Sequence, residues 1–160
     1  MKKALVGLVG GLLLLGGVAV TRAADTGSGL AVAPEVPTKQ VKHHVVVQVN
    51  FNGVDQWKGV FGNIKNLKLA LAQDGGLQVE IVTHGKGLEL LTSKDPEIVA
   101  QLKALSDSGD EVAACVHTCD SHHLTSKDLA SYVTVVDSGV AEVVRRQEQG
   151  WSYLKGGSGF

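Results

Sequence analysis

The chain has 160 residues, enough for one ordinary domain, and 44% of them are hydrophobic. Its 15 Lys and Arg side chains nearly balance 16 Asp and Glu side chains, which gives a formal net charge of −1. Removing the three basic residues of the first 23 positions would leave 12 basic against 16 acidic side chains, a charge of −4. Neither balance indicates the basic surface of a nucleic-acid-binding protein, which argues against that class, and no nucleic-acid partner is expected.

Residues 1–23 have the pattern of a secretory signal peptide. Lys2 and Lys3 form a basic start, residues 4–20 are an apolar run, and Thr21 to Ala23 place small residues at positions −3 and −1 of a cleavage site. A retained membrane anchor is the alternative, but this run is near the minimum length for a span and contains several glycines. We expect cleavage, no stable membrane span afterwards, and a periplasmic or secreted protein.

The rest of the chain divides into a linker, one domain and a tail. Residues 24–40 contain two glycines and two prolines with little periodicity, which predicts a flexible linker. The folded domain is expected at residues 41–155. Residues 156–160 read Gly-Gly-Ser-Gly-Phe and are expected to be a disordered tail.

Predicted strands and helices alternate through the domain. His43 to Phe51 is a β-branched run suited to a buried strand, and apolar residues from Trp57 to Leu71 recur at helical spacing. Leu77 to Thr83 alternates apolar and polar residues, which predicts a second strand with one less buried face or a place near a sheet edge. The remaining predicted elements are a helix from Asp95-Pro96, a strand at 111–116, a short helix with a capping box at Thr125 to Asp128, a strand at 132–136, a helix at 140–149 and an edge strand at 151–154.

This order predicts a single-domain α/β fold with a mostly parallel five-stranded sheet and helices on both faces. In the last helix, Arg145 and Arg146 are expected on a solvated or subunit-contact face. Ligands of such sheets bind beyond the carboxyl ends of the strands, so side chains at those ends form the candidate site. The side chains predicted there are those of Asn50, Asn52, His84, Cys115, His117, Asp137 and Ser138.

Cys115 is the most informative of these residues. It lies where an apolar run meets the polar segment from His117 to His123, which holds the second of the two cysteines and three of the six histidines. A thiolate here could be a nucleophile or a sulfur carrier, because nearby imidazolium or backbone N–H groups lower a thiol pKa. His84 and His117 could supply that field. The alternative is that Cys115 is a small buried hydrophobic residue.

Cys119 leaves several interpretations open. It could close a disulfide with Cys115 if the two Cβ atoms come within reach, or it could resolve a persulfide or sulfenate there. Together with His117 and His122 or His123, the two thiols could also bind copper or zinc, although their spacing matches no strong zinc signature. No glycine-rich phosphate loop follows the first strand, so no dinucleotide cofactor is expected.

Six segments of the domain match a known pattern. They are Val45-Val46-Val47-Gln48-Val49-Asn50, Trp57, Asn63-Ile64-Lys65-Asn66-Leu67, Val82-Thr83-His84-Gly85-Lys86-Gly87-Leu88-Glu89-Leu90-Leu91, Ala114-Cys115 and Ser138-Gly139-Val140-Ala141-Glu142-Val143-Val144-Arg145-Arg146-Gln147-Glu148-Gln149-Gly150-Trp151-Ser152-Tyr153. On these residues the chain resembles the DsrE/DsrF-like family of small α/β sulfur-relay proteins, over roughly Val41 to Lys155. Within that family it resembles the exported, stand-alone branch.

The resemblance implies a flavodoxin-like five-stranded sheet and a homo-oligomer, often a trimer or a hexamer. It also implies that Cys115 matches the position that carries sulfur as a persulfide in active relatives. Two departures from the family pattern stand out. Relatives tend to have Asn where His117 stands, and the stretch from Cys119 to His123 is unusual.

The leading hypothesis is an exported DsrE-like protein in which Cys115 accepts and passes on sulfane sulfur, as a sulfurtransferase-like carrier without a cofactor or a metal. His84 and His117 would tune the thiolate, and Cys119 would resolve or protect it. The expected partners are small sulfur species or a sulfur-carrier protein. The alternatives are a non-catalytic copper- or zinc-binding module and a structural homo-oligomer with a Cys115–Cys119 disulfide.

Overall fold

The computed structural model describes residues 41–157. The predicted signal peptide at 1–23, the predicted linker at 24–40 and the last three residues of the chain lie outside this range. Gly156, which the sequence placed in the tail, is buried and donates its N–H to the carbonyl oxygen of Gln48 at 2.8 Å. Within the described range, no helix is both long enough and apolar enough to cross a lipid bilayer.

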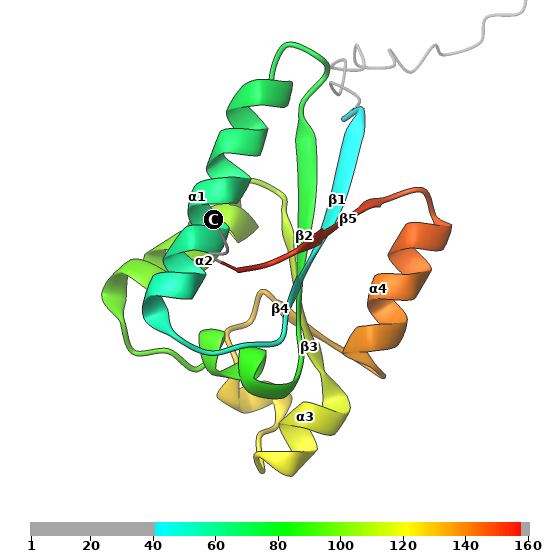
Figure 1. The fold of residues 1–160 in the computed structure, drawn as a ribbon. Helices are drawn as coiled ribbons and strands as arrows, with labels where there is room; N and C mark the ends of the chain where they lie inside the picture. Colours follow the sequence, from blue (N-terminus) through cyan, green and yellow to red (C-terminus); the bar gives the residue numbers. More distant parts are fainter. Residues whose placement is uncertain (1–40, 158–160) are drawn as a thin grey trace, which may run out of the picture. The chain divides into compact units, whose positions relative to one another are not determined.

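The β-branched runs of the sequence form one sheet. Its strands are β1 (His43–Val49), β2 (Leu77–Thr83), β3 (Glu111–Cys115), β4 (Val133–Val136) and β5 (Ser152–Lys155). They lie in the order β4-β3-β2-β1-β5, and every pair of neighbours is parallel (Figure 1). The predicted single-domain, flavodoxin-like α/β fold is therefore confirmed, with a sheet that is parallel throughout.

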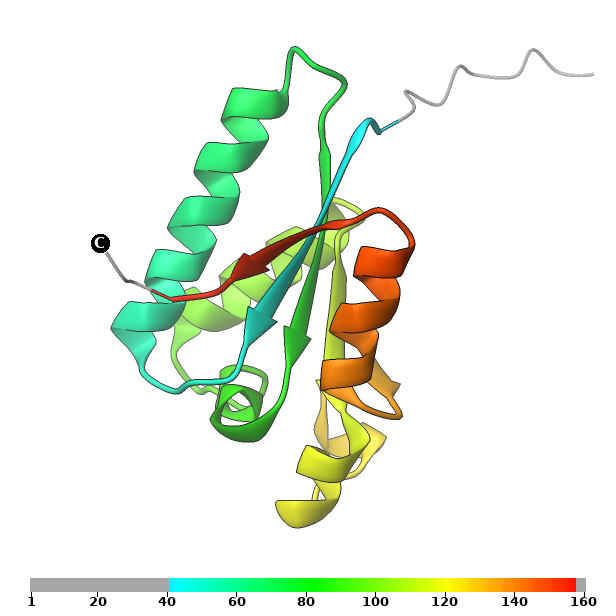
Figure 2. The ribbon, with the colours of Figure 1, turned by 45° about the vertical axis from the view of Figure 1, so that its right-hand side comes forward.

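Helices cover both faces of the sheet, as predicted. α1 (Val54–Leu71) and α2 (Pro96–Asp107) lie on one face, and α4 (Gly139–Glu148) lies on the other (Figure 1, Figure 2). From β1 to β4 each strand is added on the same side of the one before, but β5 returns to the far side of β1. Because crossovers between parallel strands are right-handed, this reversal places α4 on the opposite face from α1 and α2.

The larger part of the hydrophobic core lies between the sheet and the helices α1 and α2. Side chains alternate along β1, so Val45 and Val47 join Trp57 and Ile64 in this cluster. Val46 points the other way and belongs to a smaller cluster under α4. Burying each such side chain fully contributes about 1.5–3 kcal/mol, so the valine runs of the strands supply much of the driving force for folding.

β2 lies in the middle of the sheet rather than near an edge, which corrects the expectation drawn from its alternating pattern. Its Glu80 is only 2% exposed, and Arg146 of α4 brings its Nε to 2.7 Å from the Glu80 carboxylate. The Arg146 guanidinium also lies 4.6 Å from the ring centroid of Trp151. Arg146 is therefore partly buried against the sheet, and the predicted solvated face is wrong for this residue. The polar positions of β2 mark an ion pair under α4.

The segment after β3 is helical, whereas the sequence suggested a polar loop. α3 (Val116–Ser121) begins directly after Cys115, whose extended backbone (φ −72°, ψ 122°) makes it the N-cap residue. Six residues are too few to show a helical period, so the pattern did not predict α3. Two 3-10 helices lie beside it, η1 (Gly85–Leu90) and η2 (Ser126–Asp128), and the predicted capping box at the start of η2 is present.

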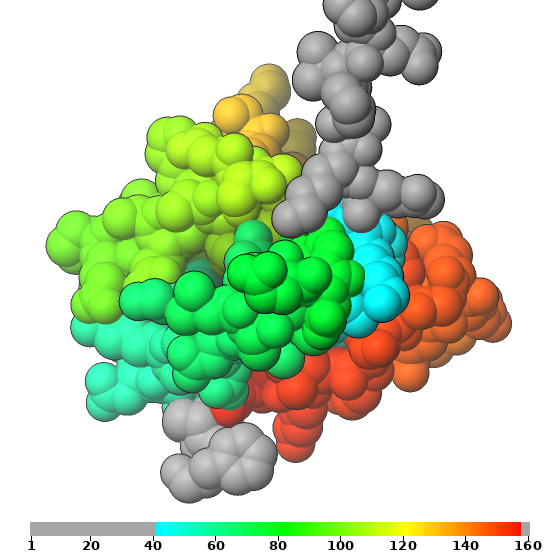
Figure 3. All heavy atoms as spheres, turned by 90° about the horizontal axis from the view of Figure 1, so that it is seen from above, coloured from blue at the N-terminus to red at the C-terminus, as the bar shows by residue number. Residues whose placement is uncertain are grey.

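A second polar network lies at the opposite edge of the sheet. The buried Asp110 accepts the Val79 N–H at 3.0 Å and the Ser108 hydroxyl at 2.9 Å, and it pairs with Lys68 of α1. Figure 3 looks onto this edge, where the start of β1 lies between the turn before β2 and the segment that leads from α4 into β5. The network ties α1, β2 and β3 together, away from the strand ends that carry the predicted site.

Candidate functional site

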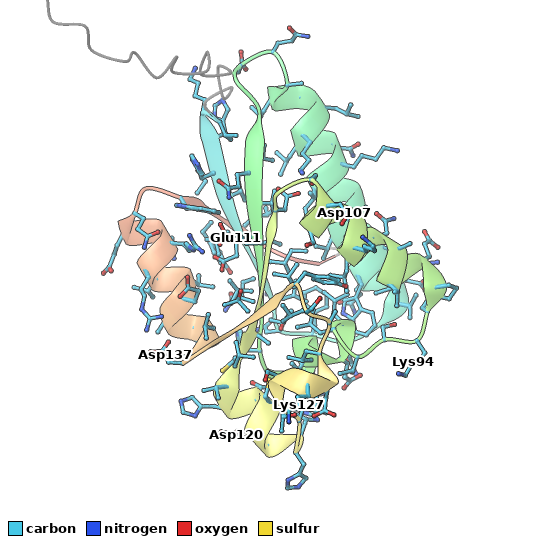
Figure 4. The ribbon with its side chains drawn as sticks, turned by 180° about the vertical axis from the view of Figure 1, so that it is seen from behind. Lys94, Asp107, Glu111, Asp120, Lys127 and Asp137 are labelled. Atoms are coloured by element: carbon cyan, nitrogen blue, oxygen red, sulfur yellow. The ribbon has the colours of Figure 1, made fainter. Side chains whose placement is uncertain are left out.

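Cys115 ends β3 where the connections of two neighbouring strands diverge. The register partner of Cys115 is Val136, the last residue of β4, and from there the chain passes to α4, while β3 leads into α3. In Figure 4, Asp137 marks the turn from β4 into α4, and Asp120 marks α3. Open parallel sheets bind ligands at such switch points. The thiol, which is 6% exposed, is thus placed at the position where this fold is expected to act.

The Cys115 sulfur lies against N–H groups from two helices. Burial alone would raise the pKa of Cys115, but hydrogen bonds from the N–H groups of Gly139, Thr118 and His117, and from the Thr118 hydroxyl, lower it overall. The neutral thiol of Cys115 makes no side-chain hydrogen bond to the first turn of α3. The charged thiolate is a stronger acceptor, and these donors stabilise it. N–H groups in the first turn of a helix have no partner within it. The site therefore favours the thiolate, the reactive form of cysteine.

Gly139 allows α4 to come this close to the strand ends. A Cβ atom at this position would lie 3.1 Å from the Cβ atoms of both Cys115 and His84, and 3.3 Å from the carbonyl oxygen of Thr83. Real Cβ contacts are rarely so short, so any larger residue would push the start of α4 away from the sheet. Ser138 precedes it as the N-cap, with its hydroxyl as the cap acceptor. Sequence analysis noted Ser138 but gave Gly139 no role of its own.

His84 follows β2 and is half-buried, with its Cβ atom close to Gly139. Its Nε2 lies 2.8 Å from Nε2 of Gln48, and the Tyr153 hydroxyl donates to Oε1 of Gln48 at 2.7 Å. Burial lowers the pKa of His84. The ring therefore favours the neutral form over the imidazolium suggested from the sequence. The groups that lower the pKa of Cys115 are backbone N–H groups and one hydroxyl.

Thr118 is a site residue that sequence analysis missed, and His117 contributes in an unexpected way. The His117 side chain is exposed, and it is the backbone N–H of this residue that reaches the thiolate. Thr118 is buried, and its hydroxyl oxygen also accepts the Gly85 N–H at 3.0 Å, which ties the loop after His84 to α3. Cys115 and Thr118 do not match the residue types of a capping box, and the sequence did not predict α3, so no local signal pointed to Thr118.

Cys119 lies one helical turn beyond Cys115 but in a different environment. It is 3% exposed and packs among apolar side chains, which are those of Leu88, Ala114 and Leu129. Burial raises the pKa of Cys119, and the negative charges of the Cys115 thiolate and Asp120 raise it further. Both cysteines are free thiols in this structure, so it contains no Cys115–Cys119 disulfide. The role of Cys119 as a resolving thiol stays a prediction.

The residues suggested for copper or zinc are not brought together. Among residues 41–157, no three His, Cys, Asp or Glu side chains are grouped so that they could hold a metal ion. His122 and His123 are exposed at the end of α3, where His123 has a left-handed backbone (φ 56°). The described part of the chain therefore gives the metal-binding alternative no ligand set.

Comparisons with known proteins place this fold in a family. Residues 62–155 match the DsrE/DsrF-like family. The structure of MTH1491, a protein of unknown function from Methanobacterium thermoautotrophicum, aligns with a TM-score of 0.65 and 28% sequence identity, over 71% of this chain and 99% of that chain. The structure of BT1422, a conserved protein of unknown function from Bacteroides thetaiotaomicron, aligns with a TM-score of 0.54 over 70% of this chain and 93% of that chain, and its 16% identity speaks for the fold alone. No curated protein matches this chain.

The matched range contains the strands β2 to β5 and therefore most of the site. Within it lie His84, Cys115, Thr118 and Gly139, whereas Gln48 of β1 precedes it. The match covers more than half of the sequence, and the parallel sheet agrees with it. The chain belongs to the DsrE/DsrF-like family.

Proposed function

We propose that this protein is a sulfur carrier that holds sulfane sulfur as a persulfide on Cys115. The observation that supports the proposal best is the place of Cys115 at the end of β3, as the N-cap of α3 and against Gly139 of α4, where N–H groups of both helices lower the pKa of the thiol. The thiolate is the form that attacks a sulfur atom, and a lower pKa keeps more of it available near neutral pH. Membership of a family of the sulfur-relay type supports the same role.

In the proposed reaction, the Cys115 thiolate attacks the outer sulfur of a donor persulfide or polysulfide. A new S–S bond forms at Cys115 while the S–S bond of the donor breaks, and the donor thiolate leaves with the electron pair. No oxidant is consumed. In the reverse displacement, an acceptor thiolate attacks the outer sulfur of the Cys115 persulfide and takes it away. Because Cys115 is only 6% exposed, small sulfur species or a carrier protein with its thiol on a protruding segment are the partners that fit.

We further propose that the protein acts in the periplasm or outside the cell, and as a homo-oligomer. The signal-peptide pattern of residues 1–23 supports the first of these proposals. Val140 and Val144 support the second, because they lie one turn apart on α4 beside the site and are 55% and 47% exposed. A trimer or a hexamer is expected from the family resemblance.

Intact-mass measurement tests the persulfide. The reduced full chain, after incubation with polysulfide, should gain about 32 Da, the mass of one sulfur atom. The added mass should be absent from Cys115→Ser and present in Cys119→Ser, which is the matched control. A wild-type chain with no added mass, or an adduct that survives Cys115→Ser, would contradict the proposal.

The same samples test export and assembly. Protein isolated from the periplasm or the medium should have the mass expected after loss of residues 1–23, and native mass measurement should show several chains per particle. An uncleaved chain would contradict export by a signal peptide, and a monomer would contradict assembly. Neither result would affect the persulfide proposal.

A further inference from the structure

Three polar side chains form a line of hydrogen bonds that ends beside Cys115. Tyr153 of β5 donates its hydroxyl to Gln48 of β1, and Gln48 in turn contacts His84 at the end of β2. These three strands are neighbours in the sheet. Gln48 is two residues from Val46, so alternation places it on the face that α4 covers. Tyr153 is 43% exposed, and the line therefore runs from solvent to the site.

The chemistry of these groups gives each hydrogen bond a direction. The Gln48 Oε1 only accepts, and it accepts the hydrogen bond that the Tyr153 hydroxyl donates. The Gln48 Nε2 only donates, so Nε2 of His84 is the acceptor of that bond. A neutral imidazole whose Nε2 accepts carries its single proton on Nδ1. Burial lowers the pKa of His84 and so keeps the ring in this neutral form.

His84 and Cys115 share the space next to Gly139. Their Cβ atoms each lie 3.1 Å from the point that a Cβ atom of residue 139 would occupy, so they are within twice that distance of each other. Within residues 41–157, no acceptor is bonded to Nδ1 of His84. The outer sulfur of a Cys115 persulfide would lie about 2 Å from Sγ of Cys115. It would be a hydrogen-bond acceptor in the space that His84 and Cys115 share.

We propose that Nδ1–H of His84 donates a hydrogen bond to the outer sulfur of the Cys115 persulfide, and that Gln48 and Tyr153 are positioning residues that hold the His84 proton on Nδ1. This inference rests on the proposed function, since it needs the persulfide as ligand. A neutral donor suits that ligand, because the outer sulfur is an anion that must remain a nucleophile. The N–H group of the neutral ring stabilises this charge by a hydrogen bond and leaves the outer sulfur reactive.

Long-range ¹H–¹⁵N correlation NMR of the reduced full chain tests the positioning role without any sulfur donor. His84, assigned by the loss of its signals in His84→Gln, should show a protonated Nδ1 and a bare Nε2. Tyr153→Phe should shift the ring toward the other tautomer, and Gln48→Leu should shift it further, because Gln48 makes the direct bond. Tyr153 is partly exposed, so Tyr153→Phe should fold normally. This variant therefore tests the inference even if Gln48→Leu folds poorly.

Two matched controls separate this role from a general effect on the sheet. Tyr132 is the other tyrosine of the chain, and Gln78 is a glutamine of β2 that donates to Glu111 at 3.1 Å. Tyr132→Phe and Gln78→Leu should leave the tautomer of His84 unchanged. The inference is overturned by a wild-type ring protonated on Nε2, or by a tautomer that is the same in wild type, Tyr153→Phe and Gln48→Leu.

The persulfide yield distinguishes this inference from the proposed function. At equilibrium with glutathione persulfide and glutathione, His84→Gln and Gln48→Leu should hold about tenfold less persulfide on Cys115 than the wild type, which is the effect of losing a hydrogen bond to an anion. The two control variants should match the wild type. Equal yields in the wild type and both site variants overturn this inference alone. A wild-type chain without persulfide overturns both proposals.

Discussion

At the scale of single residues, the acidity of Cys115 comes from hydrogen-bond donors rather than from charged side chains. The donors at Gly139 and His117 are backbone N–H groups, which only a proline, at the risk of distorting the helix, would remove. Thr118 adds a hydroxyl, and this donor can be removed alone. Hydrogen bonds to a charged group contribute about 1.5–3 kcal/mol, which corresponds to a pKa change of about one unit or more.

Thr118→Val should therefore raise the pKa of Cys115 by about one unit, since the thiolate loses one donor. The pH dependence of alkylation by iodoacetamide, measured in a Cys119→Ser background, reports this pKa. Thr134→Val is the matched control, because Thr134 is an exposed residue of the neighbouring strand β4. A midpoint of alkylation that is the same in Thr118→Val and in the unaltered background would show that the hydroxyl does not act on the thiolate.

At the scale of secondary-structure elements, α4 is the part that completes the site. Gly139 brings its first turn against His84 and Cys115, and Arg146 fixes its other end over Glu80 and Trp151. The N–H of Gly139 reaches the sulfur only because the helix starts so close to the strand ends. The position of α4 therefore connects packing with thiol reactivity.

Gly139→Ala should destabilise the fold by about 1–3 kcal/mol, because the new Cβ atom forces α4 away from tightly packed neighbours. It should also raise the pKa of Cys115 by moving an N–H donor away. Gly62→Ala is the matched control: a Cβ atom added to this glycine of α1 would meet no atom within 4 Å, and the change should stabilise the helix by about 0.5–1 kcal/mol. Urea unfolding measures the stability of both variants. A Gly139→Ala protein as stable as the wild type would contradict the close packing of α4 at this glycine.

Local patterns in the sequence predicted most elements but not the contacts between them. The strand at His43–Val49 and the helix with its cap at Asp95 were predicted, because valine runs and helix caps are local signals. The pairing of Glu80 with Arg146 was missed, since it joins residues 66 positions apart that each look solvent-facing on their own element. His84 and Cys115 were identified as strand-end residues, but Gln48 was not, because it lies inside a strand and reaches the site through its side chain.

At the scale of the whole molecule, three carboxylates converge on one guanidinium between the sheet and α4. Arg146 lies 2.7 Å from Glu80 and 3.0 Å from Glu142, and it also pairs with Glu111 (labelled in Figure 4). The Glu80 Oε2 atom is close to Arg146 yet lacks a well-directed hydrogen bond. Burial raises the pKa of the Glu80 carboxyl, while Arg146 lowers it in part. This group therefore costs the fold stability when it ionises.

The sign of the resulting pH dependence follows from proton binding. A carboxyl with a raised pKa binds more protons in the folded state than in the unfolded state. Stability is then highest below the unfolded pKa and falls as the pH rises through the folded pKa. Without Arg146 the pKa of Glu80 would rise further, and the fall would be larger.

Arg146→Met should destabilise the protein by about 3 kcal/mol near neutral pH, since it leaves a buried carboxylate without its partner. The loss of stability should be smaller at about pH 4, where the Glu80 carboxyl is protonated. It should also be smaller when Glu80→Gln is combined with Arg146→Met in one chain. Arg145→Met is the matched control: Arg145 is more exposed, and the change should cost much less stability than Arg146→Met. Urea unfolding over this pH range measures the difference, and a loss independent of pH would contradict the role of Glu80.

The two thiols of the chain lie on opposite faces of the sheet. Cys115 faces Gly139 of α4, whereas Cys119 packs with Ala114, whose side chain points the other way. A thiolate beside a persulfide would attack it, release hydrogen sulfide and leave a disulfide behind. The raised pKa of Cys119 and its apolar surroundings favour the neutral thiol, which is the less reactive form. A chain that carries a persulfide on Cys115 would thus keep its outer sulfur from its own Cys119. Only a thiol of a second molecule would take that sulfur.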